Sequence, residues 1–146
     1  MPPGNDRMQA LSESRRLVCE IELPSSWKDF FDRRGMMPIP PDDRRRFPRS
    51  YLRVGAALQD RPSLPALPRS NAWHKVYAKD LCRTGVGFLH SEQLFPKEQL
   101  AIVLPDGRPR RIEVVRCRRI GRRCFEIGAI FITHFREREA TGGPSD

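Results

Sequence analysis

The chain has 146 residues, and its 27 Lys and Arg residues outnumber its 18 Asp and Glu residues, which gives a formal net charge of +9. No apolar run approaches the roughly 18 residues that a membrane span requires. Charged residues among the first twenty exclude the apolar core of a signal peptide. We therefore expect one small domain with extensions, located in the cytoplasm.

The first 41 residues predict an extension with one short helix. Ser26, followed three residues later by Asp29, matches a capping box in which Ser26 is the N-cap residue. Three aromatic residues then follow at helical spacing, so we expect an amphipathic helix over 27–34 that packs on another part of the protein. Three prolines in residues 38–41 cannot continue a helix. They predict a semi-rigid linker that ends the extension at residue 41.

Six short apolar segments separated by Gly- and Pro-containing turns predict six β-strands. They lie at residues 51–57, 73–81, 85–89, 99–104, 111–119 and 124–133. Alternation of apolar and polar residues is clear in the second segment and in the last. In the fifth segment the apolar positions change phase, which indicates a β-bulge.

These strands predict an all-β domain over residues 42–135. The most economical arrangement is a six-stranded antiparallel β-barrel, because closure leaves no unpaired edge strand. The polar residues 136–146 are expected to form a disordered tail. Cys82, Cys117 and Cys124 lie in or beside the strands, and none of the cysteines has metal-ligand spacing, so we expect these three to be reduced packing residues.

The positive charge is almost entirely arginine, and it is concentrated in residues 44–53 and 108–123. Guanidinium groups bind phosphate in bidentate geometry and stack on planar rings. The clusters therefore indicate an anionic, nucleotide-like partner. We interpret residues 108–123 as an exposed strand face and hairpin tip rather than as part of a binding site.

Two short motifs lie at the borders of the predicted strands. Arg45 and Arg49 form R-x-x-x-R just before the first strand, and residues 80–85 read Asp-Leu-Cys-Arg-Thr-Gly between two later strands. Together with the run Glu126–Phe131, they resemble the PilZ domain family, a family of six-stranded β-barrels that bind cyclic di-GMP. That family carries R-x-x-x-R before the barrel and Asp-x-Ser-x-x-Gly at a strand end. The resemblance covers about residues 42–135.

The resemblance implies a cyclic di-GMP receptor that has no catalytic activity and no cofactor and relays the messenger to a partner protein. Six residues would bind the ligand: Arg44, Arg45, Arg49, Asp80, Cys82 and Gly85. The arginines would contact guanine and phosphate, and ligand binding would order their segment against the barrel.

The motif around residue 80 is assigned three roles. Asp80 would accept hydrogen bonds from guanine N1–H and N2–H or orient an arginine. Gly85 would let the turn run close to the ligand through a backbone conformation closed to other residues. Cys82 stands where the family has serine, and a thiol forms weaker hydrogen bonds than a hydroxyl.

Two other functions remain open from the sequence. The change to Cys82 permits a degenerate PilZ-like adaptor that binds only protein, and the net charge permits a small barrel that binds RNA or DNA with a steep salt dependence. An enzyme is not expected, because the sequence has no metal-ligand cluster, no P-loop and no carboxylate pair in an acid–base setting.

Overall fold

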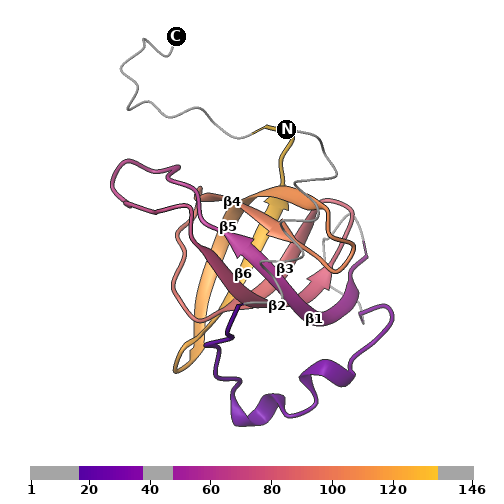
Figure 1. The fold of residues 1–146 in the computed structure, drawn as a ribbon. Coiled ribbons are helices and arrows are strands. Elements are labelled where there is room, and N and C mark those ends of the chain that lie inside the picture. The colour runs from indigo at the N-terminus through magenta and orange to yellow at the C-terminus, as the bar shows by residue number, and fades with distance from the viewer. Residues whose placement is uncertain (1–16, 38–47, 135–146) are drawn as a thin grey trace.

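The computed structural model describes residues 17–37 and 48–134, and its main body is a closed barrel of six strands (Figure 1). The strands are β1 (Ser50–Gln59), β2 (Trp73–Leu81), β3 (Gly85–His90), β4 (Gln99–Val103), β5 (Pro109–Gly121) and β6 (Cys124–Phe131). They follow the order β1-β2-β3-β6-β5-β4 around the barrel, and each observed pairing is antiparallel. The predicted fold class is confirmed.

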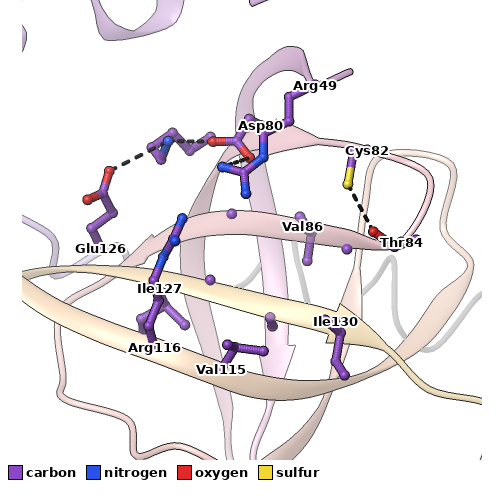
Figure 2. Close-up of a pocket in the computed structure, with 15 residues that line it drawn as sticks. Arg49, Asp80, Cys82, Thr84, Val86, Val115, Arg116, Glu126, Ile127 and Ile130 are labelled. Atoms are coloured by element: carbon purple, nitrogen blue, oxygen red, sulfur yellow. Dashed lines mark hydrogen bonds and ion pairs between the residues drawn. The ribbon is translucent and has the colours of Figure 1, made fainter. Parts of the chain in front are cut away.

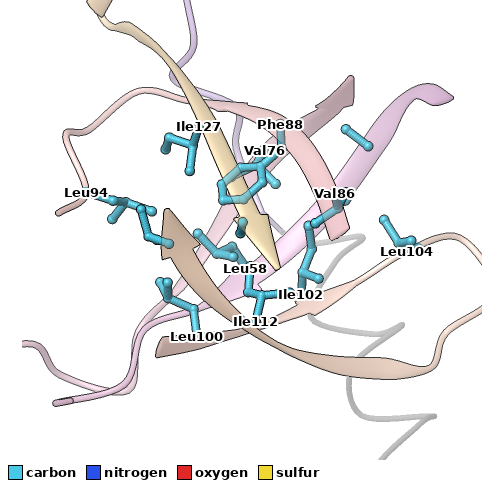
Figure 3. Packing of buried hydrophobic residues seen from close by; sticks show 14 residues of the cluster. Leu58, Val76, Val86, Phe88, Leu94, Leu100, Ile102, Leu104, Ile112 and Ile127 are labelled. Atoms are coloured by element: carbon cyan, nitrogen blue, oxygen red, sulfur yellow. The ribbon is translucent and has the colours of Figure 1, made fainter. Parts of the chain in front are cut away.

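Alternate residues of the strands fill the interior of the barrel (Figure 3). Val76 and Ala78 of β2 and Ile127 and Ala129 of β6 are buried there, in agreement with the alternation in the sequence. The largest apolar side chains that join them are Leu58, Phe88, Leu94, Leu100, Ile102 and Ile112. Positions between these inward residues face the outside of the barrel.

Among the register shifts in the described strands, two lie on the outer face over β2 and β5. One lies between Ala78 and Asp80 in β2, and the other lies between Val114 and Arg116 in β5. The second confirms the bulge predicted in the fifth strand. Because a bulge inserts an extra residue and interrupts the alternation, the consecutive residues Val115 and Arg116 are both exposed.

The segment before the barrel forms two turns of 3-10 helix, η1 (Ser25–Trp27) and η2 (Phe30–Asp32). A short helical segment is thus confirmed, but the predicted capping box is wrong. Pro24 occupies the N-cap position of η1, and no side chain caps either turn. The Asp29 carboxylate instead pairs with Arg33 at 2.9 Å.

Phe30 fastens this segment to the barrel, at the end marked by the indigo turns in Figure 1. Its side chain is 1% exposed and clusters with Leu89 and Cys124. Arg53 of β1 covers the ring, with its guanidinium carbon 4.4 Å from the ring centroid. The helical segment therefore packs on the barrel, as its apolar face predicts, and this tertiary packing determines its position more than a cap does.

Other expectations fall outside the described residues, namely the proline-rich linker at 38–41 and the disordered tail at 136–146. In the described part of the chain, no helix has the length and apolar character needed to cross a lipid bilayer.

Candidate functional site

A pocket of about 140 Å³ lies on the outer face of the barrel, over β2, β3, β6 and β5 (Figure 2). Its floor follows one row of the sheet, because Asp80 pairs with Gly87, Gly87 pairs with Gly128, and Gly128 pairs with Arg116. An acidic and a basic residue thus flank two adjacent glycines on four neighbouring strands.

The two glycines let the flanking side chains lie flat on the sheet. A Cβ atom at Gly87 would stand 2.9 Å from Asp80 Oδ1, and a Cβ atom at Gly128 would stand 3.0 Å from Arg116 Nε. Any larger residue at either position would displace the charged group beside it. The glycine pair therefore creates the hollow, and the bulges in β2 near Lys79 and in β5 near Val115 lie at its borders.

A chain of alternating charges runs along one side of the pocket (Figure 2). Arg49 Nη1 lies 3.9 Å from Asp80 Oδ1, and Lys79 contacts the other oxygen of Asp80. Lys79 Nζ also lies 3.5 Å from Glu126 Oε2, and Arg118 Nη2 lies 2.6 Å from Glu126 Oε1. Asp80 is 3% exposed, so this carboxylate is enclosed by its cationic neighbours.

The other end of the pocket carries a thiol and a hydroxyl. Cys82 Sγ lies 3.4 Å from Thr84 Oγ1. Burial opposes ionisation of this thiol, but hydrogen bonds from Thr84 and Gly85 and the charge of Arg49 outweigh it and lower the pKa of Cys82. Thr84 thus supplies a hydroxyl next to the thiol of Cys82.

Gly85 is required for a different reason from the one predicted. It is not among the described glycines with positive φ, so no special backbone conformation is involved. A Cβ atom there would stand 2.3 Å from the carbonyl oxygen of Ala129 in β6. Gly85 therefore permits the close pairing of β3 with β6 next to the pocket, and the expected special backbone conformation is wrong, while its expected closeness to the ligand stays a prediction.

Four of the six predicted site residues meet in this pocket: Arg49, Asp80, Cys82 and Gly85. Arg44 and Arg45 lie outside the described residues. Asp80 lies between Arg49 and Lys79, and the two roles predicted for it, binding guanine or orienting an arginine, stay predictions. Cys82 lies at the pocket rather than in the core, whereas Cys124 is buried and Cys117 packs at the edge of the core.

The sequence did not single out four residues that line the pocket: Lys79, Thr84, Arg116 and Glu126. Arg116 lies in the segment 108–123 that was expected to remain outside the site, so the structure corrects that expectation for this residue. The bulge in the fifth strand was the available signal. A bulge reorients a side chain, and here that side chain is Arg116.

Among the described residues, no group of three or more His, Cys, Asp or Glu side chains is placed to hold a metal ion. A scan of protein-family models gives no match to the chain, and a search of curated proteins finds no relative. The function therefore has to be inferred from the chemistry of the pocket.

Proposed function

We propose that the protein is a non-catalytic receptor for cyclic di-GMP. The observation that carries the proposal is the approach of Arg49 to Asp80, 3.9 Å apart although 31 positions separate them in the sequence. These residues belong to the two motifs that resemble the PilZ family, and they meet beside Cys82 and Gly85 on the outside of a six-stranded barrel.

The composition of the pocket suits a planar base attached to phosphate. Arg49, Lys79 and Arg116 place three cationic groups around it. Guanidinium groups pair with phosphate and stack on purine faces. The exposed apolar side chains of Val115 and Ile130 offer contact to the face or edge of a base.

The size of the pocket limits what it can hold. Its volume of about 140 Å³ is below the roughly 300–1,000 Å³ of pockets that enclose a drug-sized ligand. It therefore suits one part of a dinucleotide, and the rest of the ligand requires further contacts. Arg44 and Arg45, which lie five and four positions before Arg49 in the sequence, would supply them.

A path for relaying the binding event leads from Arg49 into the N-terminal segment. The backbone N–H of Met37 donates to the carbonyl oxygen of Arg49 at 2.8 Å, and Met36 forms a β-bridge with Ser50. A change in the position of the Arg49 backbone would therefore be transmitted to Met36 and Met37 at the end of the N-terminal segment. We propose that this segment is the part that a partner protein senses.

Isothermal titration with cyclic di-GMP tests the proposal. The wild-type protein should bind, and Arg49→Ala and Arg45→Ala should each weaken binding about tenfold or more, since a hydrogen bond to a charged group contributes roughly 1.5–3 kcal/mol. Arg110→Ala is the matched control, because Arg110 pairs with Asp106 away from the pocket. Absence of binding at tens of micromolar protein, or unchanged binding by both pocket variants, would contradict the proposal.

Nucleic acid is the second candidate ligand, and the β5–β6 hairpin favours it. Arg118, Arg119, Arg122 and Arg123 gather there and are exposed. Neutralising many phosphates makes affinity fall steeply with salt, whereas a ligand with two phosphates should give a shallow dependence. A steep salt dependence with an RNA or DNA oligonucleotide, together with no binding of the dinucleotide, would favour this second function.

A further inference from the structure

The pocket contains two carboxylates, and they differ in accessibility. The side chain of Asp80 is 4% exposed, whereas that of Glu126 is 22% exposed. Both oxygens of Asp80 face cations, and the whole group lies against the backbone of Gly87. A ligand edge can therefore reach the Glu126 carboxylate directly. To reach the Asp80 carboxylate, it would first have to displace Arg49 or Lys79.

The register of β6 places Glu126 beside the pocket floor. Glu126 is two residues before Gly128, so both positions face the same side of the strand. The separation of their Cα atoms along a strand is roughly 7 Å. A planar ring that stacks over Gly128 and the Arg116 guanidinium would thus direct one edge toward the Glu126 carboxylate (Figure 2).

The partners of Glu126 leave it able to accept more hydrogen bonds. Arg118, whose side chain is largely exposed, donates to Oε1 of Glu126 at 2.6 Å. Lys79 lies 3.5 Å from Oε2 of Glu126 and also contacts Asp80. A carboxylate has about four acceptor positions and no donor. These contacts orient the group and leave acceptor capacity on the side of Lys79.

We infer that Glu126 determines the base specificity of the pocket by accepting hydrogen bonds from N1–H and N2–H of guanine. This inference rests on the proposed binding of cyclic di-GMP. Adenine has an acceptor nitrogen in place of N1–H and lacks the 2-amino group, so its edge would oppose a carboxylate lone pair. Asp80 then orients Arg49 and Lys79, and Glu126 reads the base.

The test compares the dissociation constants of cyclic di-GMP and cyclic di-AMP for the same protein. In the wild type the guanine dinucleotide should bind more tightly. Glu126→Gln should weaken cyclic di-GMP binding about tenfold, leave cyclic di-AMP binding nearly unchanged and so reduce the ratio of the two constants by about the same factor. Glu126→Asp, which keeps the carboxylate, should retain part of the preference.

Glu20→Gln is the matched control, since Glu20 also pairs with an arginine of this hairpin, Arg123 at 3.1 Å, but does not line the pocket. It should leave the ratio unchanged. If Glu126→Gln leaves the ratio unchanged, or lowers both affinities equally, the role of Glu126 is refuted while the receptor function stands. If the wild type binds neither dinucleotide, the receptor function itself fails.

Discussion

Buried carboxylates occur at both ends of β2, and the two regions are built differently. At one end Asp80 borders the pocket. At the other end Asp60, which follows β1, contacts His74 at the start of β2, with Oδ2 and Nε2 2.9 Å apart. Nearby, Glu98 is 1% exposed and binds Arg69 through both oxygens at 2.9 Å.

The difference lies in the space beside the carboxylates. Around Glu98, the Arg69 fork and the N–H of Phe95 satisfy the oxygens at hydrogen-bond distance. Around Asp80, the partners are an arginine at 3.9 Å and a lysine shared with a second acid, beside a floor of glycines. A buried charge by itself therefore does not indicate a binding site, and open space next to exchangeable partners is the more informative feature.

We call the cluster of Asp60, His74, Glu98 and Arg69 the closed region. The largest expected effect comes from removing Glu98 from it. Glu98→Ala removes the carboxylate partner of the partly buried Arg69 guanidinium, which keeps, among the described residues, only its hydrogen bond to the carbonyl oxygen of Gln93, and breaking such a pair costs about 3–5 kcal/mol. Unfolding in urea should report this loss in the free energy of unfolding. Glu20→Ala, which removes an exposed ion pair with Arg123, should cost less than about 1 kcal/mol. Equal losses for the two variants would show that Glu98 is not a structural element of the closed region.

The closed region should also give the protein a characteristic pH dependence through His90. This side chain is 1% exposed and its Nε2 has no hydrogen-bond partner among the described residues, so burial lowers the pKa of His90 to about 3. The unfolded chain binds this proton near pH 6.5, whereas the folded protein does not. Between about pH 6 and the folded pKa of about 3, this residue should therefore reduce the free energy of unfolding by about 1.4 kcal/mol for each unit by which the pH falls.

His74 opposes this trend in a higher pH range. Its hydrogen bond to Asp60 raises the pKa of His74, so its contribution is present below about pH 6.5 and is lost as the pH rises through the higher folded value. Urea unfolding between pH 8 and pH 4 separates the two, because His90→Gln should remove the His90 part of the acid loss and keep the loss of stability that His74 gives as the pH rises above about 6.5. An unchanged acid slope in His90→Gln would contradict the assignment to His90.

The barrel could be predicted from the sequence because the alternation that marks each strand is visible within a few consecutive residues. Alternation in β2 and β6 marks the inward residues, and six such strands are most economically closed into a barrel. The capping-box prediction was wrong because it rested only on the spacing between Ser26 and Asp29. Pro24 and the burial of Phe30 decide how that segment folds, and neither effect is visible from the relation between Ser26 and Asp29.

Four site residues were predictable because two motifs contain them: Arg49, Asp80, Cys82 and Gly85. Arg116 and Glu126 join them through the pairing of β6 with β3 and of β5 with β6. The register between strands depends on the whole barrel, so spacing along the chain could not reveal the row that ends at Arg116. The role of Gly85 was missed for the same reason, since the atom that excludes a side chain there belongs to β6.

The smallest expected effect sharpens the comparison at the open end, by filling the hollow without removing a charge. In Gly87→Ala the added methyl would meet Asp80 Oδ1 at 2.9 Å, and in Gly55→Ala it would meet the end of Lys75 at 2.8 Å. Both clashes are with side-chain rather than backbone atoms, so both variants should fold, but Gly87→Ala should be the less stable because Asp80 is enclosed whereas the end of Lys75 can move. Only the first pushes a carboxylate into the pocket, and overpacking of about 1 kcal/mol predicts roughly fivefold weaker cyclic di-GMP binding in titration. Equal affinities for the two alanine variants would show that the glycine floor is not part of the binding surface.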